Sequence, residues 1–266
     1  MAKKAAGASD ERIARVARDV LGAGNAVDAV VAGVLAAAAE EPSVLLGPVQ
    51  LLVGGAGAGL LAIDGRVRQP GLGVPRPRGV RAGEQVPAEA RVGVPALPAA
   101  LATALASGGS LTLRRAAGPA VEAARSLSQE RARVLEMVSR RGAAALTDDT
   151  LAVELLAVAG RASGGVLTRE DLAAVRPAIV SCEERSLPEG VLRVPWRSTP
   201  SPDASSTHVV AAIDARGMAA AACYEAPVEG LPVRALGLVA PLFAAPVMRG
   251  QARVRPGEPR PAAAPI

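Results

Sequence analysis

Apolar residues recur at helical spacing through much of the chain, which predicts a series of amphipathic and buried helices. Between Ser9 and Gly22, isoleucine, valine and leucine share one helix face. Asn25 is expected to cap a second helix over residues 26–40, which ends before Pro42 and has an inner face of alanine, valine and glycine. Further helices are predicted over residues 97–106, 118–124, 128–141 and 150–159, and after Thr168.

Short continuous apolar runs indicate buried strands. One run covers residues 60–63 and ends at Asp64-Gly65, a pair that favours a hairpin turn between apolar segments. Another run covers residues 209–213, followed by a polar Asp-Ala-Arg-Gly turn and a second apolar run over residues 218–224.

The composition favours one globular domain with an unusual core. The chain has 266 residues, of which 50% are hydrophobic, but only one Trp, one Tyr and one Phe. Alanine, valine and leucine must therefore fill the core, and each buries less surface than an aromatic residue does. A loop rich in proline, glycine and arginine over residues 69–91 separates the first strands from the helical half.

The positive charge does not indicate a nucleic-acid partner. The net charge is +5 and the isoelectric point is near 10.1. However, the arginines alternate with acidic residues, the only lysines are Lys3 and Lys4, and almost no aromatic side chains are present to stack on bases. We therefore expect no nucleic-acid binding.

Membrane, metal and cofactor sites are not expected either. The N-terminus lacks an apolar signal segment, and no apolar run approaches the length of a membrane span, so a cytoplasmic location is predicted. Cys182 and Cys223 are far apart without the spacing of metal ligands, and we expect both to be reduced thiols. No motif for a cofactor is present.

Three adjacent hydroxyl side chains, Ser205, Ser206 and Thr207, stand immediately before the predicted strand at 209–213. N-terminal-nucleophile hydrolases place their reactive hydroxyl at such a position, where self-cleavage frees an α-amine that serves as the base. An α-amine titrates near 8, so this chemistry needs no histidine. Serine and threonine beside strands also serve as turn formers. His208, the only histidine, is expected to be a packed residue because no acidic partner lies near it in sequence.

Several motifs resemble, in the same order, those of the γ-glutamyltranspeptidase family. The clearest is Gly-Asn-Ala-Val-Asp-Ala at 24–29 followed by Glu-Pro at 41–42, and Ser206-Thr207-His208 with Asp214 and Gly217 resembles the start of the family's small subunit. The matching segments span residues 24–42, 54–68, 92–124 and 164–177, whereas residues 43–53 look like an insertion. The resemblance implies a mixed α/β (α+β) fold: a trimmed αββα N-terminal-nucleophile-hydrolase-like sandwich that forms a single domain over residues 1–266. Residues 1–205 would be large-subunit-like and residues 206–266 a short small-subunit-like part.

The resemblance also implies candidate site residues. Counting from the histidine makes Ser206 the nucleophile equivalent, whereas counting back from Asp214 selects Thr207. The family's carboxylate-binding arginine aligns near Gly73 if the glycine run at 54–59 is kept in register, which makes Arg66 a solvated strand residue. In a competing alignment, Arg66 is that substrate ligand.

Other site motifs of the family are missing from this chain. Residues 237–246 supply no carboxylate or amide, and the family's oxyanion turn is expected beyond Ile266. We therefore expect a pseudoenzyme that acts as a binding or assembly partner. The alternative is a self-processing γ-glutamyl transferase or hydrolase that cleaves amides with Ser206 or Thr207. A third reading is a homo-oligomer, or a hetero-oligomer with a related family member, in which a second chain completes the site.

Overall fold

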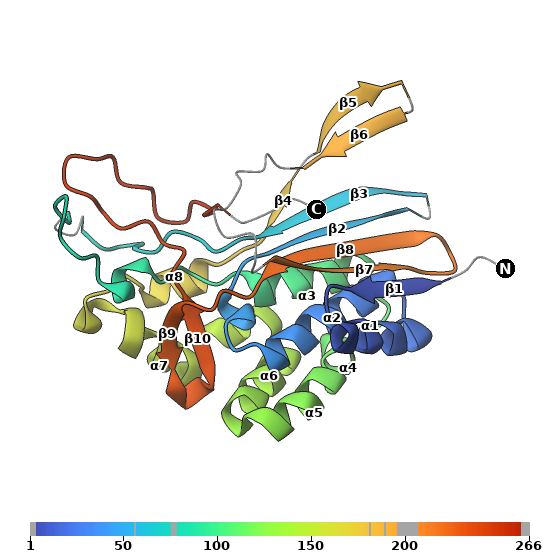
Figure 1. The fold of residues 1–266 in the computed structure, drawn as a ribbon, viewed down its shortest axis with the longest axis horizontal. Helices are drawn as coiled ribbons and strands as arrows, with labels where there is room; N and C mark the ends of the chain where they lie inside the picture. Colours follow the sequence, from blue (N-terminus) through green and yellow to red (C-terminus); the bar gives the residue numbers. More distant parts are fainter. Residues whose placement is uncertain are drawn as a thin grey trace.

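The computed structural model of the chain describes residues 4–55, 57–75, 79–180, 182–188, 190–195 and 207–261. Its centre is a six-stranded antiparallel sheet in the order β1-β7-β8-β2-β3-β4, covered by helices on one face (Figure 1). The strands of this sheet are β1 (Ala5–Ala8), β2 (Val49–Gly55), β3 (Ala58–Gly65), β4 (Ala178–Val180), β7 (Thr207–Ile213) and β8 (Met218–Glu225).

The predicted helices are present with small changes at their ends. Asn25 and Thr168 cap their helices, as the sequence indicated, and both do so through capping boxes. The helices are α1 (Glu11–Ala23), α2 (Ala26–Glu40), α3 (Leu97–Gly108), α4 (Leu113–Ala116), α5 (Gly118–Leu127), α6 (Gln129–Arg141), α7 (Asp149–Ala159) and α8 (Arg169–Ala174).

The alanine-rich helix α2 packs directly on the sheet. It is buried along nearly its whole length, and Gly33 faces Val210 of β7 so closely that an added Cβ would lie 2.8 Å from a valine methyl group. The small residues on this helix therefore have a packing function, because larger side chains would push the helix away from the strands.

Asp28 ties the start of α2 to the turn after α3. Its side chain is fully buried and accepts hydrogen bonds from the Asn25 amide at 2.8 Å, the Ser110 hydroxyl at 2.5 Å and the Leu111 amide at 3.0 Å. These donors satisfy a charge that would otherwise be costly to bury.

Two predictions about the first strands are wrong. Asp64-Gly65 is not a hairpin turn, because both residues belong to β3, whose hairpin partner is β2. Residues 43–53 are not an insertion, since they contain most of the central strand β2. The chain reverses within the glycine run instead, where Gly55 has φ +89° and an added Cβ would lie 2.2 Å from the Gly217 carbonyl oxygen.

The described residues form one helical layer against one large sheet. The other face of the sheet carries exposed apolar residues, among them Val209 at 38% and Ile213 at 43% exposure. Two small hairpins complete the fold: β5 (Glu183–Leu187) with β6 (Gly190–Val194), which projects away from the body, and β9 (Gly230–Val233) with β10 (Leu238–Pro241) (Figure 1). In the part of the chain described, no helix has the length and apolar character needed to span a bilayer.

Asp28→Ala is expected to lower the free energy of unfolding by about 3–5 kcal/mol, because it leaves buried donors of two segments without an acceptor. Urea denaturation followed by circular dichroism measures this change. The control is Asp19→Ala, an exposed position on α1, which should change stability by less than about 0.5 kcal/mol. Equal effects of the two substitutions would contradict the role assigned to Asp28.

Candidate functional site

Thr207 is the first residue of β7, and its side chain lies on the sheet face that the helices leave open. Side chains alternate along a strand, and Val210 packs against α2, so Thr207 and Val209 face the opposite side. The hydroxyl oxygen of Thr207 is buried and has no hydrogen-bond partner among the described residues. Ser206, the other nucleophile candidate, lies outside the described residues.

A row of buried polar side chains crosses the open face beside Thr207. Glu225 of β8 lies directly opposite Thr207, and Val209, Cys223, Gln50 and Asp64 are in register across four neighbouring strands. Cys223, Gln50, Asp64 and Glu225 are each no more than 5% exposed. The open face is thus apolar toward the β7–β8 turn and polar at the end where β7 begins.

Asp64 lies beside two arginines at one end of this polar row. The Arg66 guanidinium donates to its two carboxylate oxygens from Nε at 2.9 Å and from Nη2 at 2.8 Å. Arg68 lies close by, with Nη1 at 3.8 Å from the same carboxylate. Burial raises the pKa of Asp64, but the hydrogen bonds and charges of the two arginines outweigh it, so the pKa lies below its ordinary value.

Arg66 is therefore not the solvated strand residue that was expected. It follows β3, and its side chain is only 21% exposed. Its strand lies three strand spacings from β7, which corresponds to about 14 Å. Arg66 shares the open face with Thr207, but its guanidinium is occupied by Asp64.

Gly73, the other position considered for the carboxylate ligand, lies in a loop fixed by α8. The Asp171 carboxylate accepts hydrogen bonds from the Gly71 amide at 2.8 Å and from the Leu72 amide at 2.9 Å. Gly73 itself has φ +70°, a conformation that favours glycine. This loop provides a turn, and Gly73 brings no side chain to bind a substrate.

Cys223 and His208 are both unsuited to nucleophilic catalysis at this site. Burial, followed by the nearby Glu225 carboxylate, raises the pKa of Cys223 to about 11, so the thiol stays protonated at neutral pH. His208 points to the helix face, where its ring stacks on Tyr224 with centroids 5.5 Å apart. It is a packed residue, as the sequence suggested.

Sequence reasoning missed Gln50, Asp64 and Glu225 as members of the polar row. A signal was available in each case, because each is a polar residue within or at the end of an apolar run. Their meeting on one face depends on strand order and register, which the sequence does not display.

Comparisons with solved structures identify proteins of similar fold. No protein-family model and no curated protein sequence matches the chain. Among solved structures, the chain is similar to a cephalosporin acylase from Bacillus halodurans, with a TM-score of 0.79 and 16% identity over 99% of this chain and 74% of that one. It is also similar to a γ-glutamyltranspeptidase from Pseudomonas nitroreducens complexed with L-DON, with a TM-score of 0.61 and 20% identity over 76% and 72% of the two chains.

A third similar structure is the transpeptidase CapD from Bacillus anthracis, with a TM-score of 0.54 and 16% identity over 74% of this chain and 75% of that one. These proteins have the N-terminal-nucleophile-hydrolase fold, and this chain shares it. The resemblance found in the sequence motifs is confirmed at the level of the fold.

Asp64→Asn is expected to lower the free energy of unfolding by about 3 kcal/mol at pH 7, because it leaves two half-buried arginines without their counter-charge. The folded pKa of Asp64 is depressed, so its contribution is complete above the unfolded value near 4 and is lost as the pH falls through the folded value. The difference between wild type and variant should therefore shrink below about pH 4, as denaturation at several pH values will measure.

The control for this experiment is Glu122→Gln, which removes an exposed ion pair with Arg125 on α5. It should change stability by less than about 0.5 kcal/mol. A difference between wild type and Asp64→Asn that stays constant from pH 7 to pH 3 would contradict the depressed pKa.

Proposed function

We propose that this chain is a γ-glutamyltranspeptidase-like protein whose reaction centre has degenerated and whose sheet serves as an assembly surface. The observation that carries this proposal is the environment of Thr207 on the open face. Amide transfer through an acyl intermediate needs donors for the oxyanion and a grip on the substrate. The described neighbours of Thr207 argue against both.

The residue directly opposite Thr207 is an acid. Directly opposed residues in antiparallel strands have Cβ atoms about 5 Å apart, so the Glu225 side chain projects beside the Thr207 hydroxyl. A carboxylate offers acceptors only, whereas an oxyanion hole needs donors aimed at the developing charge. The side chain directly opposite Thr207 is therefore of the wrong type to form one.

The arginine closest to the role of substrate ligand is already paired. Binding a substrate carboxylate would require Arg66 to leave the bidentate contact with Asp64, which is only 2% exposed. An uncompensated buried carboxylate costs several kcal/mol, and this cost would be subtracted from the binding energy. The pair therefore favours a structural role for Arg66 over substrate binding.

The apolar part of the open face supports the assembly role. A groove of about 730 Å³ runs over β1, β7, β8 and the β2–β3 hairpin, lined by alanine, glycine, leucine and isoleucine. The six strands are three to eight residues long, so one whole face of the sheet covers on the order of 600 Å². Each partner in a standard interface contributes roughly 800 Å², so the sheet supplies the larger part of such a surface. A second copy is the simplest occupant, because two such uncharged faces can pack as aligned sheets without opposing like charges.

One observation favours the alternative, a self-processing amidohydrolase. Buried hydroxyls are normally hydrogen-bonded, and the unpartnered Thr207 oxygen at the start of β7 is the kind of exception found at reactive sites. In that case cleavage before Ser206 would yield pieces of 205 and 61 residues, and cleavage before Thr207 pieces of 206 and 60.

Intact-mass spectrometry combined with a γ-glutamyl-p-nitroanilide assay decides between these functions. We expect a single species of 26.6 kDa after prolonged incubation, and a turnover that does not differ between wild type, Ser206→Ala and Thr207→Ala. Chain cleavage abolished by either substitution, together with loss of a wild-type turnover at least tenfold above background, would establish the amidohydrolase instead.

Light scattering coupled to size exclusion tests the assembly surface. The wild type should have twice the mass of one chain, and Ile213→Glu should shift it to one chain mass, because a buried carboxylate opposing its own copy is unfavourable. The control is Val153→Glu on α7, whose parent residue is similarly exposed, at 47%, on the helical side. A wild-type monomer at all concentrations, alone and when co-expressed with a related full-length chain, would contradict this surface.

A further inference from the structure

A second pocket lies on the other face of the sheet, where the start of α1 and the end of α2 meet β7 and β8. Its volume is about 270 Å³, and its polar lining consists of Asp10, Arg12, Glu40, Glu41, His208 and Tyr224. Ile13, Ala37, Ala226 and Val228 supply apolar walls. This pocket is separated by the thickness of the sheet from the Thr207 hydroxyl and plays no part in the site described above.

Tyr224 lines this pocket with its phenol. The residue as a whole is 3% exposed and His208 stacks on its ring, and no hydrogen bond joins its hydroxyl to another described residue. Burial, followed by the nearby carboxylates of Asp10 and Glu40, raises the pKa of Tyr224 above its usual range. The phenol oxygen is therefore protonated, close to acidic groups, and free to accept a hydrogen bond.

The charge in the pocket favours a cation. Three carboxylates face one guanidinium: Arg12 Nη2 lies 2.8 Å from Glu40 and 3.4 Å from Asp10. Burial raises the pKa of Glu40, which indicates that water stabilises this carboxylate poorly. Arg12 is 69% exposed on its side chain, so its guanidinium can move into solvent at little cost.

The end of α2, beside this pocket, already holds one cation. The C-terminus of a helix carries a partial negative charge and attracts cations. The chain already places the Arg131 guanidinium there, donating to the carbonyl oxygens of Ala39 and Glu40 at 2.7 Å each. Two arginines thus converge on the same helix end, one fixed on its carbonyls and the other loosely held at the pocket mouth.

We propose that this pocket binds a small primary amine in its ammonium form, with a short apolar body. The ammonium group would take the place of the Arg12 guanidinium, donating to the carboxylates of Glu40 and Asp10 and to the Tyr224 oxygen. The apolar body would lie against Ile13, Ala37 and Ala226. A primary ammonium has three donors, which match these three acceptors.

The single histidine and single tyrosine of the chain make binding directly measurable. The probe is n-butylammonium chloride at fixed neutral pH and low ionic strength, with sodium butanoate as the probe of similar shape and opposite charge. The His208 ring resonances are followed by proton NMR. We expect saturable shifts with butylammonium, with a Kd on the order of a millimolar for so small a ligand, and none with butanoate.

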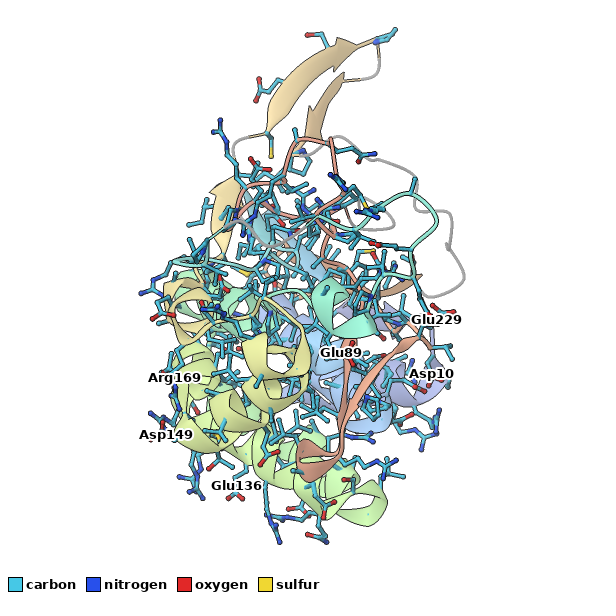
Figure 2. All side chains as sticks on the ribbon, turned by 90° about the vertical axis from the view of Figure 1, so that its left-hand side faces the viewer. Asp10, Glu89, Glu136, Asp149, Arg169 and Glu229 are labelled. Carbon is cyan, nitrogen blue, oxygen red and sulfur yellow. The ribbon has the colours of Figure 1, made fainter. Side chains whose placement is uncertain are left out.

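Variants test the assigned acceptors. Glu40→Gln should weaken binding at least fivefold and Tyr224→Phe about threefold, whereas Arg12→Ala should strengthen it severalfold by removing the internal competitor. The matched control is Asp149→Asn, which removes an exposed carboxylate paired with Arg169 (Figure 2). Asp149 lies at the opposite edge of the molecule from Asp10 in that view, and its variant should bind as wild type does.

Three results would overturn the proposal: shifts that do not saturate, an equal response to butanoate, or equal affinities of Glu40→Gln and Asp149→Asn. Arg12→Ala guards against a misleading loss of structure, because misfolding cannot produce tighter binding. The outcome is independent of chain cleavage and of assembly, since neither Thr207 nor the open sheet face takes part.

Discussion

The fold depends on how closely α2 can approach β7 and β8. The contact between Gly33 and Val210 leaves no room for a Cβ, and the residues around it on the helix are alanine and valine. With almost no aromatic residues available, the core gains its burial from many close contacts between small side chains. Asp28 and its donors hold the helix at this distance from one end, and Arg131 holds it from the other by binding the last carbonyls.

This close packing uses only one face of the sheet, and the two ends of the other face differ. Toward the β7–β8 turn, the open face is made of small and branched apolar residues that stabilise little unless something covers them. Toward the start of β7, it carries buried acids, a thiol and paired arginines. One face of the sheet therefore combines an exposed apolar end with a buried polar end.

The sequence allowed prediction of features set by local chemistry. Asn25 and Thr168 cap helices, the turn at Asp214 joins β7 to β8, and the small face of α2 packs on strands, all as expected. Prediction from the sequence failed where the residues that contact one another are distant in the chain. Asp64-Gly65 has the composition of a turn, but Asp64 is held in β3 by pairing with Gln50 and by Arg66. The polar row was not foreseen for the same reason, since register alone brings Glu225 opposite Thr207.

Buried acids in the scaffold have hydrogen-bond partners, whereas the buried hydroxyl of the candidate site has none in the described part of the chain. Asp28, Asp171 and Asp214 are each nearly or fully buried, and each accepts hydrogen bonds from backbone amides that the fold must satisfy. Thr207 differs, because its buried oxygen has no partner among the described residues. A hydroxyl that contributed only to folding would be expected to find an acceptor or a donor, as these acids have done. Thr207 therefore differs from the buried acids of the scaffold, which are paired at α2, α8 and the β7–β8 turn.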